Sequence, residues 1–328
     1  MKAIKILTMV AMATAVFASC SNEDGLPQSN YPADNVVRIM TSVDGMNTRA
    51  SYGNSADKLK SFGFCIKNAN SEKYTYDNIK VSQKGYNWIP ATQMLWQNST
   101  TAVDILAYAP YQETTEDANG KVKVFGKTDY AFSVKEDQSN AEDYSSDLIV
   151  FKQTGFTPVL ELNTSKAVEV AFTHLLSQLN LIIELRDQFN TNNNTVTKGF
   201  VTDVKVNGTI ISSKVDFSAS PISVQVDGTQ TAAITPETTG FTPAENATAH
   251  AVFNYSAIVI PQTVAAGNFS ISFKVNNTEY IWTATDAVTF ESGKKHELHL
   301  LAGKDVVQGG AISAIPWGDE TITEKETD

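Results

Sequence analysis

Histidines, cysteines and carboxylates are the side chains of this sequence that could bind a metal or do chemistry, and the spacing of the histidines argues against both roles. His296 and His299 are the closest histidine pair, and a separation of three residues places them on opposite faces of a strand, where they cannot share an ion. His174 lies among apolar neighbours, and no nearby cysteine or serine indicates a triad. We therefore expect His174 to be a hydrogen-bonded histidine at a break between strands.

Known catalytic motifs are missing as well. The sequence has no P-loop, no glycine-rich dinucleotide fingerprint and no Gly-x-Ser-x-Gly elbow. Residues 117–120 (DANG) resemble half of a calcium loop, but the other oxygen ligands and the closing Glu are absent, which favours a turn. A carboxylate pair for glycoside hydrolysis would meet only in space, and nothing singles out two of the 36 acidic residues. We expect no enzymatic activity, no metal and no cofactor.

Tryptophans offer a different kind of site, because their rings can stack on sugars. The chain has four of them, and in β-proteins such residues more often lie in the core or at a strand edge than on a sugar-binding platform. Glycan binding therefore stays an alternative that rests on Trp88, Trp96, Trp282 and Trp317.

Cys20 is the one residue for which the sequence predicts a covalent modification. Two lysines precede an apolar stretch at residues 6–18, which is too short for the roughly 20 residues of a transmembrane helix and is typical of a signal peptide. The stretch ends in residues 17–20 (FASC), which resemble a bacterial lipobox, and the acidic tract at 21–24 (SNED) resembles that of surface-exported lipoproteins. We expect residues 1–19 to be removed and Cys20 to carry a lipid anchor such as palmitate.

Cys65 is then the only other cysteine, so no intrachain disulfide can form. Phe62, Phe64 and Ile66 alternate past it and mark the core face of a strand. We expect Cys65 to be a semi-buried strand residue without chemistry.

Composition and charge limit the class of protein. The chain has 328 residues, of which 42% are hydrophobic and 19% charged, enough apolar material for about two domains with real cores. It carries 25 basic and 36 acidic side chains, a net charge of -11, and no cluster of Lys and Arg. Binding to nucleic acid depends on such clusters, so nucleic acid is a poor partner.

Period-two alternation dominates the sequence and predicts an all-β fold. Residues 269–275 (FSISFKV) alternate between apolar and polar side chains, as in a half-buried strand. Asn207-Gly208 and Asn276-Asn277 both tolerate positive φ, so each is predicted to form a hairpin turn. No capped amphipathic stretch is long enough to predict a major helix.

One change of phase interrupts this alternation. Even positions are apolar over 168–172 and odd positions over 179–185, so a bulge or bend is expected at 174–178. The polar stretch at 163–166 is the predicted domain boundary. We expect a tether at 20–35, one β-sandwich at 36–163, a second at 164–318 and a solvated acidic tail at 319–328.

Several segments, taken in order, are similar to the fimbrillin family of Bacteroidales, the subunits of lipoprotein-derived pili. The similarity covers residues 36–318 and depends more on the order of the segments than on any one of them. The segments are 46–50 (MNTRA), 59–64 (LKSFGF), 96, 103–110 (VDILAYAP), 147–150 (DLIV), 168–179, 258–262 (IVIPQ), 290–294 (FESGK) and 312–317 (ISAIPW).

The resemblance implies two transthyretin-like β-sandwiches, export as a lipoprotein and proteolysis after an arginine that follows the first strand. In this sequence the processing site would lie between Arg49 and Ala50, behind a strand at 36–43 and a loop at 44–48. Cleavage would free the strand and open an apolar groove. A neighbouring subunit, identical or homologous, could then fill the groove with a strand of its own.

The donor of that strand is expected at the carboxyl terminus, where residues 311–317 alternate and end in a large aromatic. The candidates are Ile312, Ala314, Ile315 and Trp317. The alternative is that this segment completes the sheet of its own domain.

The leading hypothesis is a structural or adhesive subunit of a fimbria at the cell outer membrane, held there by its lipid and able to contact host or bacterial surface ligands. A monomeric surface lipoprotein that binds glycans is the rival, and an outer-membrane glycosidase is a remote third.

Overall fold

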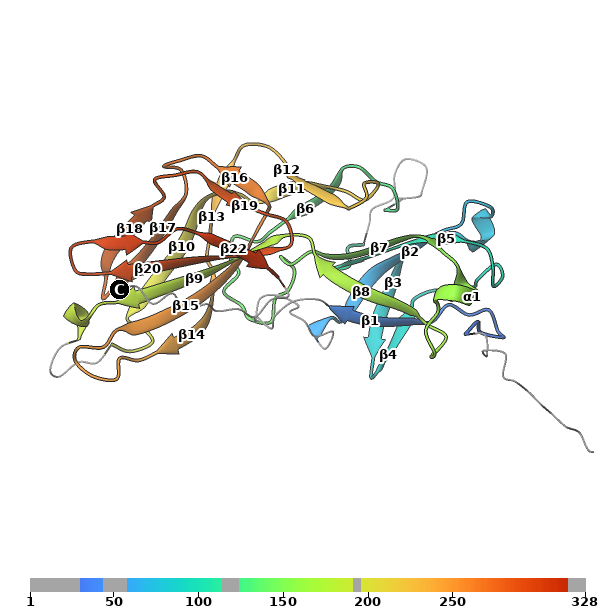
Figure 1. Cartoon of the computed structure of the whole chain (residues 1–328), viewed down its shortest axis with the longest axis horizontal. Coiled ribbons are helices and arrows are strands. Elements are labelled where there is room, and N and C mark those ends of the chain that lie inside the picture. The colour runs from blue at the N-terminus through green and yellow to red at the C-terminus, as the bar shows by residue number, and fades with distance from the viewer. Residues whose placement is uncertain (1–29, 44–57, 114–123, 191–195, 318–328) are drawn as a thin grey trace, which may run out of the picture.

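The computed structural model describes residues 30–43, 58–113, 124–190 and 196–317 (Figure 1). These residues form an elongated molecule with one group of strands at each end, and β-structure predominates, so the predicted all-β class is confirmed. The one α-helix among the described residues, α1 (Pro158–Glu161), has a single turn. No helix in these ranges is both long and apolar enough to span a membrane.

The first group is a single seven-stranded sheet. Its order is β1-β8-β7-β5-β2-β3-β4, so β1 and β4 are its two edges. The sheet curls around a core in which Phe62 contacts Phe172 and Trp88, with ring centres 5.3 and 5.1 Å apart. The strands are β1 (Ile39–Val43), β2 (Ser61–Lys67), β3 (Tyr76–Lys84), β4 (Asn87–Pro90), β5 (Val103–Ala109), β7 (Ile149–Phe156) and β8 (Val168–His174).

The second group contains a four-stranded sheet, β13-β10-β17-β18, and a six-stranded sheet, β14-β15-β9-β20 with β21 and β22 along its last edge. Apolar side chains from both sheets belong to one buried cluster, as in a β-sandwich. The strands are β9 (Ser177–Leu185), β10 (Val201–Ile210), β13 (Thr231–Ile234), β14 (Glu237–Thr242), β15 (Ala251–Val259), β17 (Ser270–Val275), β18 (Thr278–Thr283), β20 (Lys294–Ala302), β21 (Val307–Gly309) and β22 (Ser313–Pro316).

Two small sheets complete this group. One is β12-β11-β6 and the other is the pair β16-β19. Their strands are β6 (Tyr130–Ser133), β11 (Ser212–Asp216), β12 (Ser223–Val226), β16 (Gln262–Val264) and β19 (Val288–Phe290).

The chain passes between the two groups more than once, which differs from the predicted division at residue 163. β6 precedes this position but pairs with β11 of the second group. β8 follows it but pairs with β1 and β7 of the first group. The change of sheet therefore falls after β8, because the polar stretch at 163–166 is only the turn that leads into that strand.

This passage explains the change of phase in the sequence. A break at 174–178 is confirmed, and it is not a bend within one strand. β8 ends at His174, Leu175 and Leu176 connect the two groups, and β9 begins at Ser177 in another sheet. The buried positions switch from even to odd because each strand faces a different core.

The two predicted hairpin turns have different outcomes. Asn276 and Asn277, at φ 46° and 68°, form the turn between β17 and β18, as expected. Asn207 and Gly208 form no hairpin and lie inside β10, where the pairing with β13 shifts register between Val206 and Thr209. Positive φ at Gly208 serves a β-bulge here instead of a turn.

Two further expectations need correction. The predicted tether at 20–35 extends too far, because Pro32 is buried and Tyr31 packs against the first core. Cys65 is completely buried, since β2 places Phe62, Phe64 and Ile66 in one cluster and the cysteine in the other. Burial raises the pKa of the Cys65 thiol well above its usual value. Residues 1–19, 117–120 and 319–328 lie outside the described ranges.

Candidate functional site

The first candidate feature is β1, the edge strand of the seven-stranded sheet. It runs parallel to β8, with Ile39 opposite Val168 and Val43 opposite Phe172. Val37 and Ile39 are buried, whereas Met40, on the other face, is 47% exposed. β1 therefore closes one side of the core with alternating side chains, while a single neighbouring strand holds its main chain.

The unpaired side of β1 borders an open groove of about 710 Å³. Residues 36–41 form one wall, and Tyr86 with β4 forms the other. Ile89 is 49% exposed and Tyr86, at the tip of the β3–β4 hairpin, is fully exposed. Two free strand edges therefore share a groove with apolar surface, an arrangement that can accept another extended chain.

The start of β1 is more firmly held than its end. The amide of Val37 donates to the carbonyl of Met94 at 3.0 Å, and the amide of Trp96 donates to the carbonyl of Asn35 at 2.8 Å. Arg38 pairs with Asp34 at 2.6 Å, and the hydrogen bond from its guanidinium is the main reason that the pKa of the Asp34 carboxyl falls to about 2. Beyond Thr41 no such bridge to the segment after β4 is present in the described residues.

The second candidate feature is β22 at the carboxyl terminus. It pairs antiparallel with β20, with Ser313 opposite Glu297 and Pro316 opposite Lys294. Among the predicted donor residues, Trp317 is buried, Ile312 and Ile315 are half-buried, and Ala314 is exposed. In this structure the segment thus completes the sheet of its own domain, the alternative left open by the sequence.

Trp317 reaches back to the junction between the two groups of strands. Its indole stacks on the imidazole of His174 at the end of β8, and Nδ1 of His174 lies 2.9 Å from Oδ1 of Asp147. The His174 and Asp147 side chains are completely or almost completely buried. A hydrogen-bonded histidine at the strand break was predicted, but its contact with Trp317 was not, because nothing local in the sequence connects residues so far apart.

Cys20, Arg49 and Ala50 lie outside the described residues, so the structure gives no geometry for the predicted lipid and processing sites. β1 nevertheless ends at Val43, shortly before Arg49 along the chain.

Two of the four tryptophans considered for a sugar-binding platform are buried and cannot stack on a sugar. Trp96 is buried and stacks on Phe156 with ring centres 5.7 Å apart, and Trp317 is buried against His174. Trp88 and Trp282 are partly buried and pack against the two cores. The tryptophans act mainly as packing residues.

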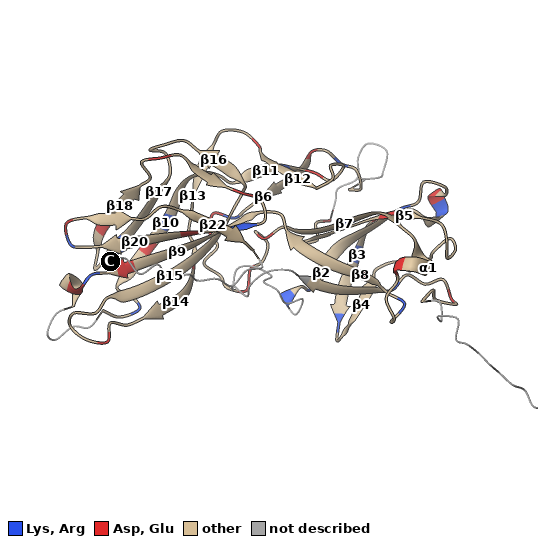
Figure 2. Ribbon diagram, viewed as in Figure 1, with Lys and Arg blue, Asp and Glu red and all other residues tan. Residues whose placement is uncertain are grey.

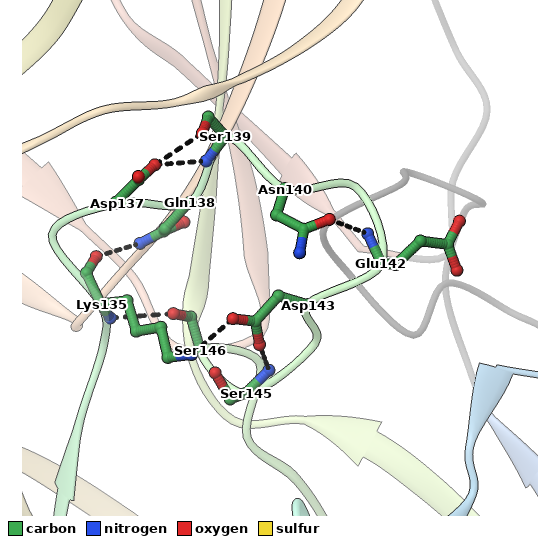
Figure 3. Close-up of polar contacts among 9 residues, drawn as sticks. All are labelled: Lys135, Asp137, Gln138, Ser139, Asn140, Glu142, Asp143, Ser145 and Ser146. Atoms are coloured by element: carbon green, nitrogen blue, oxygen red, sulfur yellow. Dashed lines mark hydrogen bonds and ion pairs between the residues drawn. The ribbon is translucent and has the colours of Figure 1, made fainter.

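The loop from β6 to β7 contains a set of polar side chains that bind one another (Figure 3). Asp137 accepts hydrogen bonds from Ser139, Asp143 accepts from Ser145 and from Lys135, and the amide of Glu142 donates to Asn140. Backbone amides and a lysine thus occupy carboxylate oxygens that a cation would need. No group of metal-binding side chains occurs in the described ranges.

Charge is spread along the molecule. In the part of the chain that the structure describes, Lys and Arg are dispersed over both groups of strands (Figure 2). Histidines 296 and 299 lie on opposite faces of β20, as expected: His296 is buried and His299 is exposed.

Comparison with known proteins gives the family. The sequence profile described as Fimbrillin-like matches residues 48–317. A candidate cell adhesion protein of Bacteroides ovatus is similar in structure, with a TM-score of 0.61 and 14% identity over 88% of this chain and 100% of that one. One from Bacteroides uniformis has a TM-score of 0.56 and 18% identity over 87% of this chain and 99% of that one. No curated protein sequence matches significantly.

The family is structural and not enzymatic, which agrees with the expectation that the chain is not an enzyme, and it implies a fimbrial or adhesion protein of the cell surface. Because this profile matches most of its length, the chain belongs to the fimbrillin-like family.

Proposed function

We propose that the protein is a subunit of a cell-surface fimbria, exported as a lipoprotein and joined to its neighbours by strand exchange after cleavage between Arg49 and Ala50. The observation that carries the proposal is the position of β1. It is an edge strand, it fills the core with alternate side chains, and it ends shortly before the proposed cleavage site.

Loss of β1 would leave the first sheet with an unpaired edge and an empty apolar groove. β8 would become the new edge, and Val168, Val170 and Phe172, all completely buried now, would line a vacant groove. Unpaired main chain beside apolar surface favours addition of a strand, since hydrogen bonds restore the ladder and alternate side chains refill the core.

The carboxyl-terminal segment of a neighbouring subunit is the proposed donor. Among the described residues β22 pairs with β20 alone, so breaking that one ladder would release it. Donation would also require Trp317 to leave His174. Release of the donor from its own domain is therefore a step of the proposed assembly.

The lipid on Cys20 would hold the precursor at the outer membrane before assembly. Nine residues (21–29) separate this cysteine from the first described residue, Asn30. Cleavage at Arg49 would then separate the assembled subunit from its anchor, so the same cut that opens the groove would free the subunit to enter the fibre.

The test compares Arg49→Ala with the wild-type protein in cells, with Arg186→Ala as the matched control. The chain has three arginines, and Arg38, just before β1, is ion-paired with Asp34. We expect Arg49→Ala to remain monomeric, while wild type and Arg186→Ala form a ladder of multimers on a mildly denaturing gel and show Ala50 as the amino terminus. Assembled fibres that still begin at Cys20 would contradict the proposal. A cleaved protein that stays monomeric would favour the glycan-binding alternative.

A further inference from the structure

Thr41 is an unusual residue in the middle of β1. Ile39 and Thr41 occupy successive inward positions of this strand, and Ile39 is a buried aliphatic side chain, as is Val37 just before the strand. The Thr41 hydroxyl oxygen is buried as well, and it has no hydrogen-bond partner among the described residues. Its neighbour on β8 is Val170, which is completely buried.

A hydroxyl in this position weakens the strand. Burying an unpaired hydroxyl removes it from water without a replacement partner, and this penalty is paid only while β1 is in place. Valine has nearly the same shape and the same preference for strands, and it would avoid the penalty. In the part of the chain that the structure describes, β8 is the strand that pairs with β1, on one side of it.

We propose that Thr41 is a built-in weak point of β1, and that the strand which replaces β1 carries an apolar side chain opposite Val170. This inference rests on the proposed strand exchange and adds a selection rule for the incoming strand. A donor with an aliphatic residue at this register fills the same space without an unpaired hydroxyl. It therefore binds the groove more tightly than the strand it displaces, and the released segment competes poorly for its former place.

The first experiment uses the intact chain and needs no exchange. Thr41→Val should raise the midpoint of thermal unfolding, and hydrogen exchange should show slower opening of β1. Thr278→Val is the matched control, because the same chemical change there lies on an exposed strand position and should leave both values unchanged. An unchanged or lower midpoint for Thr41→Val would overturn the inference whatever the outcome for assembly.

The second experiment follows the exchange itself. The full chain carrying Arg38→Lys and Arg186→Lys, in which Arg49 is the remaining arginine, is cut there with an arginine-specific protease. Labelled peptides of residues 30–49 with Lys at position 38 and Thr or Val at position 41 then compete for the groove. We expect the Val peptide to bind about ten-fold more tightly, and the cut Thr41→Val chain to release its own segment about ten-fold more slowly.

The two failures can be told apart. If the cut protein releases no segment and binds neither peptide, the strand-exchange function is wrong, and the selection rule falls with it. If it exchanges strands but binds both peptides equally well, the exchange stands and the role of Thr41 is wrong.

Discussion

The indole of Trp317 lies flat on the imidazole of His174, with 4.0 Å between the ring centres and 6° between the ring planes. This contact joins the last described residue of the chain to the end of β8, the same strand that pairs with β1. β8 therefore contacts both segments of the proposed exchange. It pairs with β1, the strand proposed to leave, and its last residue stacks on Trp317 of the proposed donor segment.

The stack makes a prediction about stability. Trp317→Ala should lower the free energy of unfolding by about 3–5 kcal/mol, because a large buried side chain is lost from a site that cannot fully collapse. Trp317→Phe keeps an aromatic ring on His174 and should lose clearly less. Urea denaturation of the monomers measures both. A Trp317→Ala monomer as stable as wild type would show that the segment contributes nothing to its own domain.

Gly208 provides a second prediction, from the bulge in β10. Its φ is 93°, and a Cβ atom would lie 2.0 Å from the carbonyl oxygen of Asn268. Gly208→Ala combines an unfavourable backbone conformation with a clash against main chain, and should cost about 1–3 kcal/mol or more. Gly199→Ala is the control, since a Cβ there meets nothing within 4 Å and the φ is not positive. Similar melting temperatures for the two variants would contradict this account.

The same glycine shows the limit of local sequence patterns. Gly208 has the positive φ that the Asn-Gly pair predicts, whereas Asn207 does not, because a bulge needs this conformation at one residue and the predicted turn needs it at both. Alternation within a single strand was enough to predict which side chains are buried. The apolar residues of the 269–275 segment all face the core, as predicted: Phe269, Ile271, Phe273 and Val275.

Pairing between distant segments could not be predicted in this way. The alternation of residues 130–133 and 168–174 identifies strands, yet says nothing about which sheet each one joins. β6 pairs with β11 across some 80 residues of sequence, which tertiary packing decides. The change of phase was visible in the sequence, but its cause, a passage between two cores, was visible only in the structure.

In the candidate site, too, the strands could be predicted from the sequence and the contacts between them could not. Period-two alternation predicted strands at both ends of the chain, and β1 and β22 are there. The open edge of β1, the unpaired Thr41 hydroxyl and the Trp317–His174 stack depend on neighbours from β4 and β8, and no local pattern encodes them.

The predicted anchor is tested through Cys20. Cys20→Ala should abolish incorporation of a radioactive fatty acid and stop delivery to the outer membrane, because this thiol would carry the whole attachment. Cys65→Ala is the matched control, since that thiol is completely buried and should not affect labelling. Label that persists in Cys20→Ala would rule out the lipobox assignment.

His296 gives the last prediction, a dependence of stability on pH. Burial is the main reason that its pKa lies below 6.5, and its Nε2 accepts a hydrogen bond of 3.0 Å from the amide of Glu291, which only an unprotonated nitrogen can do. Below pH 6.5 the unfolded chain takes up a proton that the folded chain still refuses, so stability falls as the pH drops from 6.5 to the folded pKa. NMR titration of the His296 ring should show the lowered pKa. His296→Gln should remove the loss of stability that His296 causes in acid. His299→Gln, an exposed substitution on the opposite face of β20, should retain that loss. A His296 ring that titrates at or above 6.5 in the folded protein would contradict the prediction.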